Sequence, residues 1–589
     1  MLSRRILIAL SALSVSFAAA PDGAALYKSR CGICHDGKPQ LHMPSHEDLA
    51  SKTPEAVVKA MFEGIMVPQA AGLSEEEGRA IAKFITAKEF STSTAATMTG
   101  QCTAAPKPLA ISSTDWNGWG QELGNSRYQP HPGLAAADVP KLKVKWAFGF
   151  PGDTSSQAQP TVVGGRVFVG SVGGTLYSLD ASSGCMYWSY KVGASIRNAI
   201  TIGKVGGHFI AFFGDIKANA YAVDAESGML LWKVKVDDHP VARIVGTPTF
   251  YDGHLYVPMS SIEEASAMGP AYECCKFRGS VSSLDAETGK VLWKSFTVLD
   301  PPKAFKTSST GAQAYGPAGA AVWSSPTIDP KRKLVYVATG DSYTDVDFNT
   351  SDAVLAFDLS TGRLLWSTQA TAKDNFTMAC GQAGKANCPE TKGPDFDFGT
   401  SPALRSIGGG KQLLVIGQKS GILWALDPDN KGKVVWQTRV GKGGALGGIE
   451  WGHAADDTTA YAAVSDRGKG PGSVNAVNLK TGEIQWTKLT PETGHLTAMS
   501  AAISVIPGIV FAGGVDAHFR AYDSKTGEIV WDYDAAHPYD TVNGVPAKGG
   551  SFDAPGPVIA NGMVFTASGY GMWGGSAGNV LLAFSVDGK

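Results

Sequence analysis

The chain has little net charge and, beyond its first twenty residues, no long apolar run. Its 589 residues include 51 Lys and Arg against 53 Asp and Glu, a formal net charge of −2. A chain this close to neutrality is a poor candidate for a general nucleic-acid binder, which needs an excess of basic residues. No stretch after residue 20 has the roughly 20 apolar residues that a membrane-spanning helix requires, so we expect no transmembrane segment there.

Cysteine is also scarce, with eight residues, whereas glycine and tryptophan are plentiful. Hydrophobic residues account for 43% of the chain and charged residues for 18%, which excludes wholesale disorder. The 71 Gly and 14 Trp, without a collagen period, indicate many short strands joined by glycine turns. Length alone suggests about four domains, but the repeats described below lead to a different organisation.

Residues 1–20 have the pattern of a signal peptide. Arg4 and Arg5 precede an apolar run at residues 6–17, and three alanines ending at Ala20 form a small-residue cleavage site. The apolar run is too short for a membrane anchor. We therefore expect export and, if the source is Gram-negative, a periplasmic location, where the cysteines can be oxidised or bound to a cofactor.

A covalent haem is predicted for residues 21–90. Residues 31–35 read Cys-Gly-Ile-Cys-His, the C-x-x-C-H attachment signature of c-type haem. The thiols of Cys31 and Cys34 would add to the haem vinyl groups, and His35 would bind the iron from one side.

The second axial ligand of this haem has several candidates, namely Met43, Met61, Met66, His42 and His46. We favour Met66 because it precedes a predicted helix with Ser74 as N-cap and Glu77 at the capping-box position. This arrangement resembles the distal half of small cytochromes c, where the axial Met precedes the last helix. His/Met ligation is typical of electron-transfer haems with a relatively high reduction potential.

After a linker rich in Ser, Thr, Ala and Pro at residues 91–110, one sequence pattern repeats to the end of the chain. It consists of an apolar residue, Asp, two variable residues, Ser or Thr, Gly, three variable residues and Trp. The copies, one of them with an extra residue and one with Asn for Asp, end at Trp188, Trp232, Trp293, Trp366, Trp436, Trp486 and Trp531. The segment at Trp146 lacks the turn half and the C-terminal LLAFSV lacks the Trp half, so together they make an eighth unit.

Each copy predicts a strand, a tight turn with Gly in a left-handed conformation, and a second strand whose Trp packs between neighbouring sheets. Repeats of short strands at this spacing indicate radial blades and not separate domains. We therefore predict an all-β eight-bladed β-propeller at residues 111–589, closed by the two chain ends, with a small all-α cytochrome c domain before it. The longer middle repeats indicate inserted loops on one functional face.

The repeat resembles the tryptophan-docking motif of dehydrogenases that use pyrroloquinoline quinone (PQQ). Residues 116–120 and 125–128, WNGWG and NSRY, also resemble the start of their propellers. The resemblance covers essentially all of residues 111–589. The haem module ahead of the propeller and the segment SSIEEASAMGPAYECCKFRGS at 260–280 are similar to the cytochrome-containing polyvinyl-alcohol dehydrogenases of this family.

This resemblance implies an enzyme that oxidises secondary hydroxyls of polyvinyl alcohol to ketones. Its cofactors would be PQQ, haem c and a hard cation, Ca²⁺ or a lanthanide, and an external cytochrome would accept the electrons. The same chemistry on small primary or secondary alcohols is the alternative. A scaffold propeller of the outer-membrane assembly type shares the blade motif but has no haem.

The resemblance also implies a metal site and a base. Glu263 stands where the family places a Ca²⁺-binding Glu, and Asp341 where it has a metal-binding Asn. An ungapped match makes Asp395 the general base, also beside the metal, and Asp397 an additional carboxylate. A one-residue gap would exchange the roles of Asp395 and Asp397.

Further residues match cofactor contacts of the family. Trp323 corresponds to the Trp that stacks under the quinone, Lys419 to a basic residue that faces it, and Trp573 to the glycine-rich floor of the pocket. Arg197 and Arg243 would neutralise the cofactor's carboxylates. Glu450 departs from the Asn of the relatives, and its role stays open.

The cysteines outside the haem motif are expected to form three disulfides. Cys274 and Cys275 are adjacent, and the resemblance implies a vicinal disulfide against one face of PQQ. Cys380 and Cys388 would close a loop, and elimination leaves Cys102 with Cys185.

Overall fold

The computed structural model describes residues 21–36, 45–50, 52–62, 66, 70, 73–90, 99–381 and 386–589. The predicted signal peptide and the ligand candidates His42 and Met43 lie outside these residues. The chain forms two compact units, Met1–Thr94 and Ala95–Lys589, each described below by itself. Within the described ranges, no helix is both long and apolar enough to cross a bilayer.

The first unit is helical, as predicted. Its described helices are α1 (Gly23–Arg30), α2 (Gly32–His35), α3 (His46–Ala50), α4 (Pro54–Phe62) and α5 (Glu75–Thr86). The capping box that the sequence predicts is present at the start of α5. Ser74 Oγ accepts the Glu77 N–H at 3.2 Å, and the Glu77 carboxylate accepts the Ser74 N–H at 2.8 Å. The apolar face of α5 buries Ile81 and Ile85 against Tyr27 and Met61.

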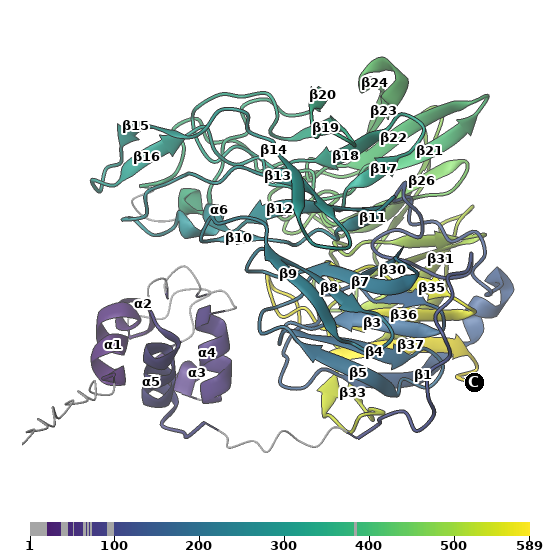
Figure 1. Ribbon diagram of the computed structural model, residues 1–589, viewed down its shortest axis with the longest axis horizontal. Coiled ribbons are helices and arrows are strands. Elements are labelled where there is room, and N and C mark those ends of the chain that lie inside the picture. The colour runs from purple at the N-terminus through teal and green to yellow at the C-terminus, as the bar shows by residue number, and fades with distance from the viewer. Residues whose placement is uncertain are drawn as a thin grey trace, which may run out of the picture. The chain divides into compact units, whose positions relative to one another are not determined.

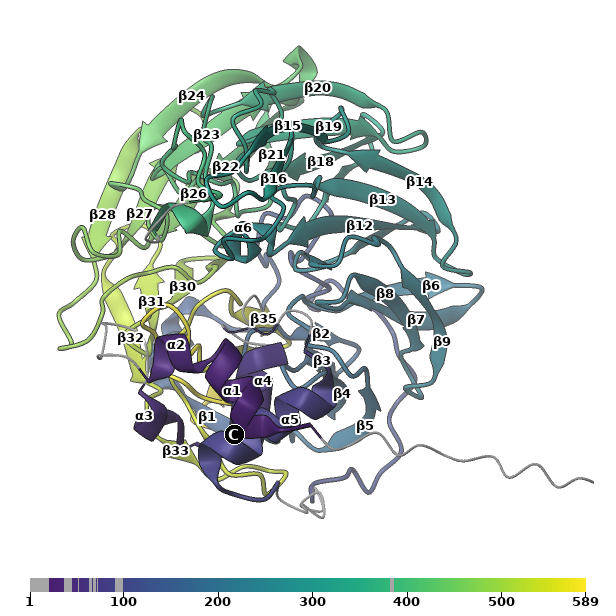
Figure 2. The same ribbon diagram turned by 90° about the vertical axis from the view of Figure 1, so that its left-hand side faces the viewer.

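The second unit is a ring of eight antiparallel sheets, each built mainly of four strands (Figures 1 and 2). Seven of them contain, in chain order, β2 (Thr161–Val163), β3 (Arg166–Gly170), β4 (Thr175–Asp180), β5 (Met186–Lys191); β6 (Thr201–Val205), β7 (His208–Gly214), β8 (Asn219–Asp224), β9 (Leu230–Lys235); β10 (Ala242–Arg243), β11 (Thr249–Tyr251), β12 (His254–Ser261), β13 (Ser280–Asp285), β14 (Val291–Phe296); β17 (Thr327–Asp329), β18 (Leu334–Ala338), β19 (Ala353–Asp358), β20 (Leu364–Gln369); β21 (Ala403–Gly408), β22 (Lys411–Gly417), β23 (Ile422–Asp427), β24 (Lys433–Arg439); β25 (Ala454–Ala455), β26 (Thr459–Val464), β27 (Ser473–Asn478), β28 (Ile484–Leu489); and β29 (Ser504–Ile506), β30 (Ile509–Gly513), β31 (His518–Asp523), β32 (Ile529–Asp534).

The eighth sheet joins the two ends of the propeller. β1 (Leu142–Gly149) pairs antiparallel with β37 (Val580–Val586), from Leu142 opposite Val586 to Gly149 opposite Val580. β36 (Met563–Ser568) and β35 (Val558–Ala560) complete this sheet. The predicted eight-bladed propeller and its closure by both chain ends are therefore confirmed.

Several inserts lie between the blade strands. They are η1 (Ala136–Lys141), α6 (Glu263–Ser266), β15 (Lys303–Thr307), β16 (Gln313–Gly316), η2 (Met378–Gly381), η3 (Pro428–Asn430), β33 (Pro538–Tyr539) and β34 (Ala547–Lys548). Within the propeller, α6 and the hairpin β15–β16 lie on the same side of the ring, toward the left in Figure 1. That side carries the site described below.

Each repeat tryptophan packs against the next blade, and in the described structure all but Trp366, which packs on Gly432, also donate a hydrogen bond to it. The Trp232 indole N–H donates to the Ala286 carbonyl at 3.0 Å, and a Cβ placed on Gly289 would lie 2.8 Å from the Trp232 ring. The same indole-to-carbonyl bond, at 3.0–3.3 Å, joins Trp146 to Ala181, Trp188 to Ala225, Trp293 to Leu359, Trp436 to Leu479, Trp486 to Ser524 and Trp531 to Leu142. The glycine of each repeat therefore supplies both the left-handed turn and the space for the neighbouring indole.

Part of the predicted linker is bound to the propeller. Cys102 forms the expected disulfide with Cys185, and Leu109 is buried in an apolar cluster of the first two complete blades. The Leu109 N–H also donates to the Glu226 carboxylate at 3.1 Å. Residues 99–110 thus belong structurally to the propeller.

The docking glycines can be tested with a matched pair of substitutions. Gly228 (φ +79°) and Gly253 (φ +76°) have the same left-handed backbone, but only a Cβ on Gly228 meets an indole, at 2.7 Å from the Trp188 ring. We expect Gly253→Ala to cost about 1 kcal/mol and Gly228→Ala about 1–3 kcal/mol more, because the added methyl overpacks the interface. Thermal unfolding of both variants measures this difference. Equal losses would contradict the docking role.

Candidate functional site

A cavity of about 430 Å³ opens on the propeller face that carries α6 and β15–β16. Its polar lining consists of Arg197, Arg243, Glu264, Asp341, Asp395, Asp397, Lys419, Glu450, Arg467 and Asp553, with backbone and hydroxyl groups of Ser260 and Ser261. Its large apolar and aromatic lining includes Trp323, Tyr343, Phe376, Met378, Leu446, Trp451, Tyr570, Met572 and Trp573. The sequence-predicted residues are all brought together here except Glu263, the two vicinal cysteines and those of the haem module.

Four of the charged lining residues occupy similar places in different blades. Asp341 is the third residue after β18, Arg467 the third after β26 and Glu264 the third after β12, while Lys419 is the second after β22. Because the corresponding strands of a propeller end on one face, side chains just beyond them converge near the ring axis. This position rule explains how four distant segments form one site.

Three carboxylates form the acidic side of the cavity. Oxygens of Asp341, Asp395 and Asp397 lie within 4.8 Å of one another, and all three side chains are buried. Burial, followed by the charge of neighbouring Asp397, raises the pKa of both Asp341 and Asp395 well above the usual range. Asp341 Oδ2 has no hydrogen-bond partner in the described structure. Such a crowded, under-neutralised set of oxygens suits a hard cation.

Lys419 neutralises part of this charge. Its ammonium contacts Asp395 Oδ1 and lies 3.3 Å from Asp397 Oδ2. Burial alone would lower the pKa of Lys419, but the attraction of Asp395 and Asp397 outweighs it and the pKa is raised well above its usual value. Lys419 is therefore a fixed cation beside the acids.

Asp395 and Asp397 are held in different ways. Asp397 Oδ1 accepts the Asp341 N–H at 2.7 Å, so both of its oxygens have partners. Asp395 has a left-handed backbone (φ +61°), and its N–H donates to Asp374 Oδ1 at 2.9 Å. Asp374 also accepts the N–H of Phe396. Asp374 thus fixes the turn that aims Asp395, a positioning role that the sequence did not reveal.

Glu263 does not line the cavity, whereas its neighbour Glu264 does. The Glu263 carboxylate is fully buried and accepts the N–H groups of Lys276 (2.9 Å) and Phe277 (2.7 Å) and the Tyr272 hydroxyl (3.0 Å). These hydrogen bonds hold the loop after α6 in place. Burial, then repulsion by Asp397, raises the pKa of Glu264 to about 7. Of the two glutamates, Glu264 and not the expected Glu263 therefore lines the acidic cavity. The position rule above does not separate them, because Glu263 is the second residue after β12, as Lys419 is after β22.

Another part of the cavity lining is cationic and aromatic. Arg197 lies over the Trp451 ring at 5.5 Å, and Trp451 meets Trp323 edge-on with centroids 4.9 Å apart. Burial, then the charge of Arg197, lowers the pKa of Arg243 to about 9. The Nε atoms of both arginines are buried and have no partner among the described residues. Neither arginine has a carboxylate partner among the described residues, and two adjacent cations of this kind fit a polyanionic ligand such as a tricarboxylate.

Trp323 is packed so closely that its neighbour must be glycine. A Cβ on Gly399 would lie 2.2 Å from both the Trp323 ring and the Glu450 carbonyl. The Gly-rich floor places Trp573 on the rim, where it is 42% exposed and its carbonyl accepts a hydrogen bond from Arg467. Trp573 therefore lines the cavity opening.

The vicinal disulfide is present but does not face the cavity. Cys274 and Cys275 are bonded and buried, and Tyr343 lies between them and the cavity, since it borders both spaces. Cys274 instead lines a small space together with Cys388. The expectation that this disulfide forms one wall of the cofactor site is therefore not reproduced. The third expected disulfide, Cys380–Cys388, is also present.

A second cluster of charged side chains in the cavity consists of Arg467, Asp553 and Glu450. The sequence analysis singled out only Glu450. Arg467 pairs with Asp553 at 3.2 Å, and Glu450 lies beside them with Oε1 buried and unpartnered in the described structure. Burial, then Asp553, raises the pKa of Glu450 to about 8. At neutral pH this side chain is therefore a hydrogen-bond donor aimed into the cavity region.

The haem-binding segment is a helical turn in the first unit. The His35 N–H donates to the Cys31 carbonyl at 3.1 Å, and the His35 side chain is 7% exposed. Met66 packs against the buried cluster that contains Met61, and its N–H donates to the Ala60 carbonyl at 3.0 Å. Met61 is a core residue, as expected, and His46 contacts Tyr27 and Asp36. Met66 stays the proposed second ligand.

Family models match both units of the chain. One described as "Glucose/ethanol/alcohol dehydrogenase, beta-propeller domain", a PQQ family, matches residues 116–439. One described as "Cytochrome C oxidase, cbb3-type, subunit III" matches residues 18–85. A third, "Outer membrane protein assembly factor BamB", matches residues 418–551, where the blade repeat continues.

Curated relatives extend the similarity to nearly the full chain. A polyvinylalcohol dehydrogenase of a Pseudomonas species is 44% identical over 99% of this chain and 96% of its own length. That of Sphingopyxis sp. (strain 113P3) is 43% identical over 96% and 93%. Among solved structures, quinohemoprotein alcohol dehydrogenase ADHIIG of Pseudomonas putida HK5 has a TM-score of 0.62 at 16% identity and covers 81% of each chain, a likeness of fold.

The two adjacent glutamates can be separated by experiment. We expect Glu264→Gln to weaken calcium binding at least tenfold with little change in thermal stability, because Glu264 lines the acidic cavity. We expect Glu263→Gln to cost about 1–3 kcal/mol of stability, since buried N–H donors would lose an acceptor. Calorimetric calcium titration in the presence of PQQ and thermal unfolding give the two readouts. The reverse pattern would restore Glu263 as the metal-side residue.

The raised pKa of Glu450 predicts a pH dependence of stability. The folded protein keeps this carboxyl protonated up to about pH 8, whereas an unfolded Glu ionises near pH 4.3. Stability is therefore lost as the pH rises through this window, and Glu450→Gln removes that loss. We expect the melting temperature of Glu450→Gln relative to wild type to rise between pH 5 and about pH 8. The exposed Glu492→Gln variant is the control, and a pH-independent difference for Glu450→Gln would contradict the prediction.

Proposed function

We propose, from the fact that the chain belongs to the family of PQQ-dependent alcohol dehydrogenases, that it oxidises secondary hydroxyls of polyvinyl alcohol to ketones. The observation that carries this proposal is one cavity lined both by two arginines whose buried Nε atoms have no partner among the described residues and by a buried cluster of aspartates. The polymer assignment is supported by the 44% and 43% identity to the two polyvinylalcohol dehydrogenases over nearly the whole chain.

The residues of the cavity fit PQQ. When bound, PQQ supplies an ortho-quinone that accepts two electrons, while haem c carries them singly. Arg197 and Arg243 would bind its carboxylates, since their buried Nε–H groups have no other described partner. Trp323, Trp451 and Trp573 would pack against its ring system.

The acidic side of the cavity would hold Ca²⁺. Asp341, Asp397 and Glu264 are the proposed ligands in the propeller, and a hard cation would relieve the repulsion that now raises the pKa of Asp341 and Glu264. Asp341 in place of the family's Asn adds a negative charge, so a lanthanide is the second candidate ion.

Asp395 is the proposed general base. Its Oδ1 contacts Lys419, which leaves Oδ2 to accept the proton of the substrate hydroxyl. Both oxygens of Asp397 have partners, which favours a binding role for that residue. Asp374 holds the backbone of Asp395, and the aromatic rim limits access of water.

The other assignments complete the proposal. Cys31 and Cys34 would carry the haem, and His35 and Met66 would bind its iron. The electrons would leave to an external cytochrome. The signal-peptide pattern of residues 1–20 supports a periplasmic location.

The electron path and the base are tested together by the haem spectrum. Oxidised protein is loaded with PQQ and Ca²⁺, and polyvinyl alcohol is added anaerobically. We expect a reduced cytochrome c band that requires both PQQ and polymer. We expect Asp395→Asn to bind PQQ but to slow this reduction about 10²–10⁴-fold, whereas Asp397→Asn loses calcium-dependent PQQ binding.

The outcomes distinguish the alternatives. Reduction by small alcohols but not by polymer would replace the polymer assignment with small-alcohol oxidation. A slow but PQQ-binding Asp397→Asn variant beside an active Asp395→Asn variant would exchange the two roles. No reduction by any alcohol, with PQQ bound, would overturn the proposed function.

A further inference from the structure

A second cavity, of about 530 Å³, lies on the same face of the propeller. Its lining comes from segments 298–300, 342–351 and 369–375, which follow β14, β18 and β20. Asp341 also follows β18, so both cavities open beyond the same strand ends. The second cavity therefore stands beside the candidate active site, between two neighbouring blades.

The two cavities share a thin wall. Asp341 lines the first and Ser342 the second, and likewise Phe376 lines the first and Asn375 the second. The wall is hydrogen-bonded, since the Phe376 N–H donates to the Ser342 carbonyl at 2.8 Å. A long flexible substrate lying over this face would thus contact both cavities.

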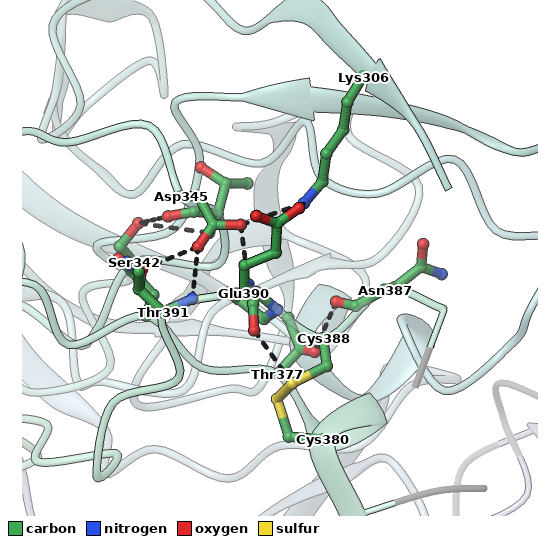
Figure 3. Close-up of polar contacts among 12 residues, drawn as sticks. Lys306, Ser342, Asp345, Thr377, Cys380, Asn387, Cys388, Glu390 and Thr391 are labelled. Carbon is green, nitrogen blue, oxygen red and sulfur yellow. Dashed lines mark hydrogen bonds and ion pairs between the residues drawn. A yellow bond between two sulfur atoms is a disulfide. The ribbon is translucent and has the colours of Figure 1, made fainter. Parts of the chain in front are cut away.

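The Asp345 carboxylate joins the loop after β18 to neighbouring segments by hydrogen bonds and an ion pair. Figure 3 shows Asp345, which accepts the N–H groups of Glu390 (2.9 Å) and Thr391 (3.0 Å) and pairs with Lys306 of β15 at 3.2 Å. The nearby Cys380–Cys388 disulfide cross-links the loop after β20, which carries Glu390 and Thr391. The loop after β18 is therefore fixed before any ligand arrives, which lowers the cost of binding.

The lining combines apolar carbon with neutral hydrogen-bonding groups. Val298 is buried in the floor and Leu299 is 65% exposed at the rim, with Val346 and Phe348 nearby. The carboxamides of Gln369 and Asn375 donate to Ser351 (3.1 Å) and Thr391 (2.8 Å). In the described chain neither carboxamide oxygen accepts a hydrogen bond, so both remain available for a hydroxyl.

The charge of the second cavity argues for a neutral ligand. Asp347 and Lys373 pair across it at 3.7 Å, which leaves Asp300 at the exposed rim as the remaining charge. An anionic or cationic ligand would meet no matching cluster, in contrast to the first cavity. A neutral chain that alternates CH₂ and CHOH can make apolar contacts through its carbons and hydrogen bonds through its hydroxyls, and the lining offers partners for both.

We infer that the second cavity binds a stretch of the polyol chain while another hydroxyl of the same chain lies at Asp395. This inference rests on the proposed function and adds a polymer subsite to it. The subsite would act on affinity for long substrates alone, because a small alcohol cannot reach it from the first cavity.

Two rim variants test the subsite. Leu299→Asp places a charge against the chain, and Ala372→Trp fills the cavity; both positions are exposed lining residues and neither belongs to the catalytic cavity. Leu489→Asp is the matched control, since Leu489 is 58% exposed at the end of β28 and lines neither cavity. The holoenzyme is assayed with long-chain polyvinyl alcohol and with a small 1,3-diol, and its retardation is measured in native gels that contain the polymer.

We expect both rim variants to raise KM for the polymer about fivefold to tenfold, to lose retardation and to keep wild-type kcat and diol kinetics. The control should behave like wild type. Unchanged polymer KM and retardation in both variants would overturn the subsite while leaving the proposed function intact. An equal rise of KM for the diol would also overturn it. Wild-type protein that oxidises the diol but not the polymer would remove the polymer assignment itself.

Discussion

The ring depends on one repeated interaction, an indole that donates to a carbonyl of the next blade and covers its glycine turn. Seven of the eight repeat tryptophans make this bond in the described structure, and the one from Trp531 to Leu142 joins the two ends of the ring. Trp366, the eighth, packs on Gly432 of the next blade. The interaction fixes the spacing of neighbouring sheets and therefore the positions of the strand ends. Side chains beyond those ends converge only because the blades are held in this way.

Convergence brings charges together that the chain itself does not balance. Acids are crowded until their pKa values rise, and Arg197 and Arg243 keep buried Nε atoms that have no partner among the described residues. Separated charges of this kind cost folding free energy unless a ligand compensates them. The second cavity, whose lining carries little net charge, lies on the same face and shares a wall with the first. The protein thus has an ionic cavity and, beside it, a neutral cavity with apolar and hydrogen-bonding groups.

The sequence was sufficient for the architecture because the Gly-to-Trp repeat is both periodic and physically necessary. Blade number and ring closure followed from this repeat, and the capping box at Ser74 followed from its own short motif. The vicinal disulfide was implied by the family resemblance, and the Cys102–Cys185 pair was left by elimination. The site was harder. Glu263 and Glu264 are adjacent acids, and the packing of Glu263 against the N–H groups of the loop after α6 decides that Glu264 lines the cavity. The place of Cys274–Cys275 behind Tyr343 depends on loop packing that no local motif encodes.

The closure of the ring by β1 and β37 has a consequence for folding kinetics. Leu142 and Val586 pair although almost the whole propeller lies between them in sequence. Contacts of such high sequence separation form slowly, because the chain loses conformational entropy before the contacts stabilise the fold. Until β37 is available, β1 presents an unpaired strand edge, the kind of surface on which other chains add strands. Ring completion is therefore the step at which this protein would be most vulnerable to aggregation.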